Sequence, residues 1–115
     1  MNAAYWEQLK AEAQRVVEET IAELPPEIQA EAQKVPCLFE KVCKEDPELL
    51  GSYGNFVPGE VSDANGPIVL YLVTLDDFCA DEDADFDEEV RLTYLHELGH
   101  HLGWDEDDLE ARGLE

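Results

Sequence analysis

The stretch from residue 87 to residue 102 constrains the fold most, because its helical pattern has two unequal sides. At about 100° per residue, three side chains, His96, Glu97 and His100, gather with Thr93 within an arc of about 100°. The other side is broad and apolar, and it contains Val90, Leu92, Tyr94, Leu95, Leu98 and Leu102. An apolar side of this width has to be buried. The sequence therefore predicts a core-packed helix over 87–102 with one narrow polar stripe.

The rest of the sequence predicts the elements that would supply this core. Apolar residues recur at helical spacing over 3–24, and a proline suits the first turn of a short helix over 26–33. Strand-forming residues predict a strand over 35–43, and a short strand over 53–57 is a further candidate. Residues 67–75, "PIVLYLVTL", are apolar on both faces and predict a strand inside a sheet.

The order of these elements predicts an α+β fold. A small mixed β-sheet would pack against the N-terminal amphipathic helix and against the C-terminal helix with the polar stripe. The chain is 115 residues long, a common size for one domain, so we expect a single domain over residues 1–115.

An acidic stretch over 76–89 precedes the C-terminal helix and predicts a loop. Asp85 is expected to cap the helix, with Glu88 completing a capping box. Asp81 and Asp83 alternate with Asp85 like the start of a calcium-binding loop. However, the glycine and the glutamate that such a loop needs at its sixth and twelfth positions are absent. We therefore expect a solvated, helix-capping loop.

The charge of the chain limits the partners that it is expected to bind. Aspartate and glutamate number 29 against 7 lysines and arginines, which gives a formal net charge of −22. A field of this sign repels phosphate groups, so we expect neither nucleic acid nor an anionic membrane as a partner. No stretch approaches the ~20 apolar residues of a membrane span, and the N-terminus lacks the pattern of a secretion signal. We therefore expect a cytoplasmic protein.

The three cysteines, Cys37, Cys43 and Cys79, are odd in number and include no C-x-x-C pair. Neither a disulfide framework nor a cysteine zinc site is indicated. We expect buried free thiols.

The polar stripe combines residue types that bind a metal ion. His96 and His100 stand one turn apart, so both imidazoles can reach one zinc ion. Glu97 would stand beside the ion, where its carboxylate can take a proton from water, so His-Glu-x-x-His predicts two ligands and a general base. His101 points about 100° away from His100 and is expected to pack or hydrogen-bond at the helix end. Among the tyrosines, we favour Tyr53 as a donor to an oxyanion.

A hydrolytic zinc site usually has three protein ligands and a water molecule. Gly103 follows the helix, where a left-handed glycine can reverse the chain. Three residues later, Glu106 would return toward the two histidines, and Asp105, Asp107 and Asp108 are open alternatives. The sequence thus predicts one Zn²⁺ per chain, held by the two histidines and Glu106.

The segment "HELGHHLGWDE" fits H-E-x-x-H-x-x-G-x-x-E and resembles the Asp-zincin and metzincin signature, with Glu106 at the third-ligand position. With an N-terminal amphipathic helix ending in Leu-Pro, "LLGSYG" and "PIVLYLVTL", most of the chain is similar to the minimal zincin family. This is a family of small bacterial zinc-metallopeptidase-like proteins. The resemblance implies a zinc-dependent peptidase that uses metal-activated water, with Glu97 as general base and a peptide or protein as substrate.

Two departures from the larger zincins keep a second function open. Metzincins have a methionine turn beneath the metal, whereas the only methionine here is Met1. The large substrate-binding subdomain of familiar zinc proteases is also missing. The alternative is a non-catalytic zincin-fold binding module that binds metal weakly or not at all, or that uses its acidic surface to engage a basic partner. For the enzyme, a sheet edge, with strand 67–75 as the candidate, would align an extended substrate by main-chain pairing.

Overall fold

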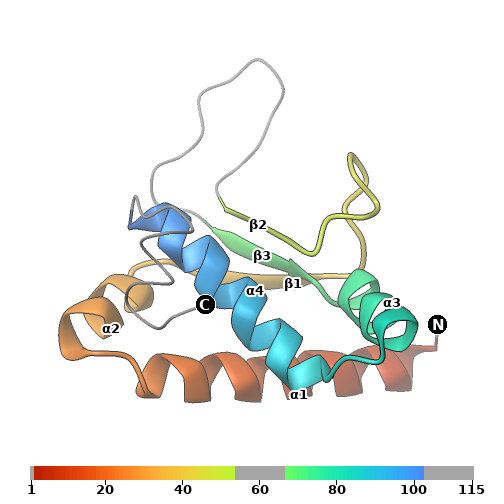
Figure 1. Ribbon diagram of the computed structural model, residues 1–115, viewed down its shortest axis with the longest axis horizontal. Helices are drawn as coiled ribbons and strands as arrows, with labels where there is room; N and C mark the ends of the chain where they lie inside the picture. The colour runs from red at the N-terminus through yellow and green to blue at the C-terminus, as the bar shows by residue number, and fades with distance from the viewer. Residues whose placement is uncertain (1, 54–66, 103–115) are drawn as a thin grey trace.

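The computed structural model describes residues 2–53 and 67–102, and Figure 1 shows its helices and strands. Within these ranges a small sheet lies among helices, which confirms the α+β class. In chain order the elements are α1 (Ala3–Ala22), α2 (Pro26–Gln33), β1 (Cys37–Glu40), β2 (Gly51–Tyr53), β3 (Ile68–Tyr71), α3 (Leu72–Glu82) and α4 (Phe86–His101).

β3 forms the centre of the sheet, because the strand order is β1–β3–β2. It pairs with β1 in parallel and with β2 antiparallel, so the sheet is mixed as predicted. Its central place confirms that this segment lies inside the sheet. Ile68 and Leu70 are fully buried, whereas Val69 and Tyr71 on the other face are half-buried. The two outer edges belong to β1 and β2. Near the β1 edge, Leu38 and Val42 are exposed.

The predicted strand over 67–75 is wrong in its second half. β3 ends at Tyr71, and the chain continues directly into α3. Leu72, Leu75 and Cys79 are buried at helical spacing, so the apolar run continues as one side of a helix. A short apolar run does not by itself distinguish a buried strand from a buried helix. The same helix replaces much of the loop predicted over 76–89.

The other two strands are also shorter than the sequence predicted or lie elsewhere. β1 covers only the middle of the predicted strand over 35–43. Its four residues pair with the four residues of β3, and the ladder cannot continue where β3 becomes a helix. β2 lies mainly before the candidate strand over 53–57, and residues 54–57 fall outside the described ranges.

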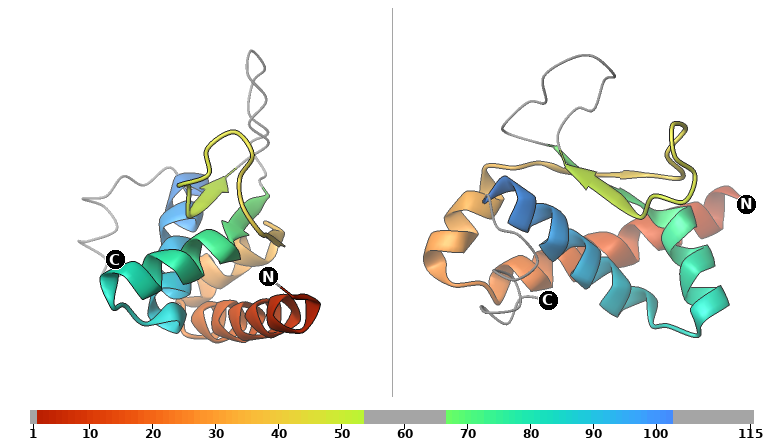
Figure 2. Two further views of the ribbon diagram at one scale, coloured as in Figure 1. Left: turned by 90° about the vertical axis from the view of Figure 1, so that its right-hand side faces the viewer. Right: turned by 45° about the horizontal axis from the view of Figure 1, so that its top comes forward.

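α4 lies between the sheet and α1, and Figure 2 shows this arrangement from two further sides. It contacts α1, α3, β2 and β3. Its predicted apolar side is confirmed at four buried positions, Val90, Tyr94, Leu95 and Leu98, and α1 contributes Leu9, Ala13, Val16 and Val17 to the same core. In the part of the chain that the structure describes, no helix has both the length and the apolarity to cross a bilayer.

Candidate metal centre

α4 begins at a side-chain cap and ends at its histidines. Asp85 accepts a hydrogen bond of 3.0 Å from the backbone N–H of Glu88, which confirms the predicted N-cap. Acidic residues occupy the first turn, and His100 and His101 occupy the last. The helix dipole favours negative groups at the first end and positive groups or cations at the second.

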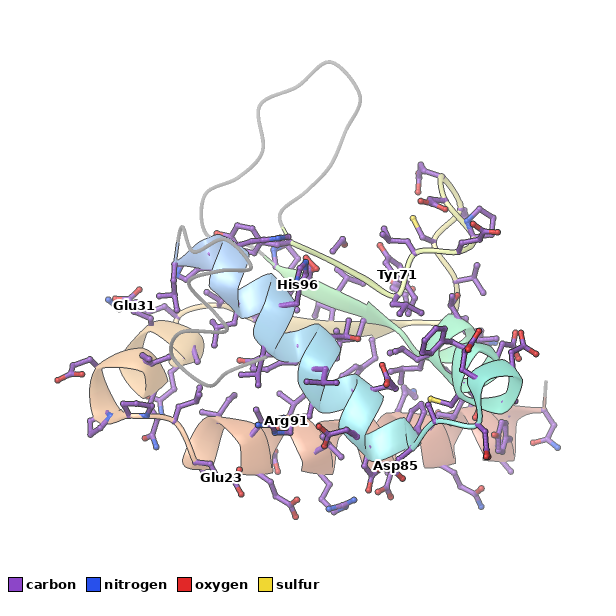
Figure 3. All side chains as sticks on the ribbon, viewed as in Figure 1. Glu23, Glu31, Tyr71, Asp85, Arg91 and His96 are labelled. Carbon is purple, nitrogen blue, oxygen red and sulfur yellow. The ribbon has the colours of Figure 1, made fainter. Side chains whose placement is uncertain are left out.

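Three side chains of the polar stripe meet in the C-terminal half of α4, where Figure 3 shows His96. His96, Glu97 and His100 each offer one ligand atom, and these atoms all lie within 4.8 Å of one another. The two imidazole ring centroids are 4.6 Å apart, and His100 Nδ1 lies 3.1 Å from a Glu97 carboxylate oxygen. Two atoms that bind one zinc ion at about 2.1 Å lie at most ~4 Å apart. Small side-chain rotations would therefore bring the ring nitrogens to coordination distance.

Glu97 is buried, although it belongs to the polar stripe. Its side chain is 7% exposed, against 47% for His100. Burial raises the pKa of Glu97, and the nearby His100 and His96 oppose that rise. A buried carboxylate needs a polar or charged partner, which the imidazoles supply and a cation would supply more strongly. The two histidine nitrogens are donors that fit zinc, and the buried carboxylate would lie beside the ion.

The predicted third ligand lies outside the described part of the chain. Glu106 and its alternatives, Asp105, Asp107 and Asp108, all follow residue 102, as does Gly103. The ligand role of Glu106 therefore stays a prediction from the sequence.

His101 hydrogen-bonds at the end of α4, as predicted. Its Nδ1 lies 2.7 Å from the Tyr53 hydroxyl, and its Nε2 lies 3.4 Å from a Glu31 carboxylate oxygen. Because the Tyr53 hydroxyl is directed at His101, this contact does not support the predicted oxyanion role. No sequence pattern indicated Glu31, because 70 positions separate it from His101.

β2 lies against the side of α4 that carries the stripe. A Cβ atom added at Gly51 would lie 2.7 Å from the Thr93 side chain. At the other end of β2, Tyr53 contacts His101. Because Thr93 belongs to the stripe, β2 passes along the same side of the helix as His96 and His100. Glycine at position 51 permits this close approach.

Comparison with known protein families agrees with this geometry. The chain matches the family model described as zincin-like metallopeptidase over residues 21–114, a span that includes the whole of the candidate site. No curated protein matches the chain. The family match confirms the resemblance that the motif and its neighbouring segments indicated.

Proposed function

The chain belongs to the zincin-like metallopeptidase family, and from this we propose that it is a zinc-dependent peptidase. His96 and His100 are the first two zinc ligands, Glu106 is the third, and Glu97 is the general base. The observation that carries the proposal is the cluster on α4, where the ligand atoms of His96, Glu97 and His100 lie within 4.8 Å of one another. The family match supports the peptidase class and its metal.

Each residue of the site has a distinct part in the proposed reaction. When bound, a zinc ion supplies a Lewis acid that polarises the scissile carbonyl and lowers the pKa of water. His96 and His100 bind through imidazole nitrogens one helical turn apart. Glu97 takes a proton from the attacking water at a carboxylate oxygen and delivers it to the leaving amine.

The burial of Glu97 suits a general base. A base works best when its pKa lies near the operating pH, and burial raises the pKa of this carboxyl from its ordinary acidic value. The contact of 3.1 Å with His100 also holds the carboxylate in one orientation. A fully exposed glutamate would have neither property.

The proposed substrate is an extended peptide that pairs with β2. The expectation that the 67–75 segment aligns the substrate is wrong, because β3 has β1 on one side and β2 on the other. β2 is an edge strand, and within residues 2–53 and 67–102 its outer edge has no partner strand. A peptide paired with that edge would run along the side of α4 that carries Glu97.

Zinc content and peptide cleavage together test the proposal in the wild type and in Glu97→Gln. Protein purified without chelator should contain about one zinc ion per chain in both forms. The wild type should cleave members of a mixed peptide library, and Glu97→Gln should lose at least ~100-fold in rate, because the proton acceptor is removed. For the third ligand, Glu106→Gln should weaken zinc binding, whereas the matched change Asp105→Asn should not.

Other outcomes give the residues other roles. Loss of zinc from Glu97→Gln would make Glu97 a ligand and not the base. Bound zinc without cleavage by the wild type would favour the non-catalytic binding module. A wild type that binds no zinc would contradict the site.

A further inference from the structure

We infer that a hydrogen-bonded chain of Tyr53, His101 and Glu31 positions β2 against α4 and thereby sets the alignment of a peptide substrate. The positioning of β2 depends on geometry alone, whereas the alignment of the substrate rests on the proposed function. These hydrogen bonds join three elements that are distant in sequence, namely β2, α4 and α2 (Figure 3 labels Glu31).

His101 is the centre of this chain. Its Nδ1 lies 2.7 Å from the Tyr53 hydroxyl, and its Nε2 lies 3.4 Å from Glu31 Oε2. The His101 and Tyr53 rings also meet edge to face, with 5.5 Å between their centroids. The His101 side chain is only 10% exposed, so water competes poorly for its two ring nitrogens.

The chemistry of the three groups gives the chain a direction. Glu31 also pairs with Lys34 at 3.1 Å, so it is an ionised carboxylate that can only accept hydrogen bonds. His101 therefore donates from Nε2–H, and a neutral imidazole then accepts at Nδ1. The Tyr53 O–H donates to that nitrogen.

β2 meets α4 at its two ends. At one end, Gly51 lies close to Thr93, and at the other end Tyr53 bonds to His101. The metal-binding stripe of α4 lies between these two contacts. β2 pairs with β3 through only three residues, a short ladder for holding a strand at a fixed angle. Removing the Tyr53 hydroxyl would therefore release one end of β2 from the helix.

The hydrogen-bonded residues Tyr53, His101 and Glu31 consequently position β2 and take no part in the chemical step. A peptide paired with β2 moves with that strand, so a loosened β2 binds the peptide less well. The groups proposed to act on the scissile bond stay in place on α4. Loss of the hydrogen bonds among Tyr53, His101 and Glu31 should therefore raise KM and leave kcat unchanged.

Tyr53→Phe tests the inference, because it removes one hydroxyl and keeps the ring. In the zinc-loaded full-length chain, KM for a cleaved peptide should rise about threefold to tenfold, the value of one hydrogen bond, with kcat within about twofold. The affinity for Co²⁺, measured from its visible absorption on binding, should be unchanged. Tyr71→Phe is the matched control, because its hydroxyl lies 3.2 Å from Ser52 Oγ of β2 and not against α4. It should leave KM unchanged.

A second measurement needs no activity. The Tyr71 N–H donates to the Leu50 carbonyl (3.0 Å) on the β2 side of β3, whereas the Ile68 N–H donates to the Pro36 carbonyl (2.9 Å) on the β1 side. Because backbone N–H groups alternate between the two sides of a strand, the Val69 N–H also lies on the β2 side. In metal-free Tyr53→Phe, hydrogen exchange at the Val69 amide, which lies opposite Ser52 and next to the released end of β2, should be about threefold to tenfold faster than in the wild type. Exchange at the Ile68 amide should be unchanged.

The remaining outcomes separate this inference from the proposed function. A fall in kcat at constant KM would overturn it, since that pattern belongs to a catalytic tyrosine or to a partly unfolded variant. Unchanged exchange at Val69 would overturn it as well, because the Tyr53 end of β2 would then be held without the hydroxyl. A wild type that cleaves no peptide contradicts the proposed function, and the exchange experiment then decides the positioning of β2 by itself.

Discussion

At the scale of single residues, the partners of buried polar groups distinguish two side chains of α4. Glu97 is buried beside two imidazoles. Tyr94 is fully buried in the core, as its place on the helix predicted. Its hydroxyl is the only buried side-chain polar atom without a hydrogen-bond partner among residues 2–53 and 67–102. Burying the Tyr94 hydroxyl therefore lowers the stability of the fold, because no hydrogen bond compensates for its loss of contact with water.

Tyr94→Phe should leave the free energy of unfolding unchanged or raise it by up to ~1 kcal/mol, because it removes an unpaired buried hydroxyl. Urea unfolding of the metal-free chain measures the difference. Tyr94→Leu, which removes ring atoms as well, should destabilise the fold, because it leaves a cavity. A clear loss of stability in Tyr94→Phe would show that the hydroxyl has a partner.

The cysteines are free thiols, as predicted, and Cys43 and Cys79 are buried, whereas Cys37 is only half-buried. Burial raises the pKa of Cys37 to about 12, and the thiolate is the reactive form. At pH 8, alkylation of Cys37 in the native chain should therefore be at least ~100-fold slower than in the unfolded chain. The native rate should increase as the pH rises toward 12. Mass spectrometry after a short iodoacetamide pulse measures both rates, and rapid native labelling at pH 8 would contradict the assignment.

At the scale of elements, the close contact between β2 and α4 depends on a missing side chain. Gly51→Ala should cost roughly 1–3 kcal/mol of stability. Its new Cβ would lie 2.7 Å from Thr93 Cγ2 and 3.2 Å from the Val69 carbonyl oxygen. Thr93→Ser removes the methyl group that clashes, so the double variant should recover part of the loss in urea unfolding. A double variant no more stable than Gly51→Ala would assign the strain to the Val69 backbone.

The helices with a one-sided pattern could be predicted from the sequence, whereas the contacts between elements could not. The expected helix over 87–102 is α4 almost residue for residue, because its pattern persists over several turns and Asp85 marks its start. The run over 67–75 failed because an apolar segment fits a strand or a helix equally well. A helical wheel shows which side faces inward but not which neighbour covers it. The wheel therefore could not predict that Glu97 is buried or that Tyr53 hydrogen-bonds to His101.

At the scale of the whole molecule, the net charge of −22 dominates the long-range field. Four of the basic side chains in the described part of the chain already face carboxylates, namely Lys10, Arg15, Lys34 and Arg91. Their pairing leaves the surface field strongly negative, so the molecule should attract cationic peptides and repel anionic ones.

Cationic peptides should therefore be cleaved with a higher kcat/KM than anionic peptides of equal length. The preference should be at least ~10-fold at low ionic strength, and it should shrink at about 1 M salt, where the Debye length is only ~3 Å. Cleavage of charge-matched peptide pairs at both salt concentrations measures it. A preference that salt does not change would place the selectivity in short-range contacts.

The outer edge of β1 gives the same acidity a second role. Among residues 2–53 and 67–102 this edge has no partner strand. A strand edge without a partner, flanked by apolar side chains such as Leu38 and Val42, is a template on which identical molecules can stack. β1 is only four residues long, and every approaching copy carries the same large negative charge, so mutual repulsion acts before the main chains can meet. This barrier against self-association weakens as protons neutralise the carboxylates and the pH approaches the isoelectric point near 4.1.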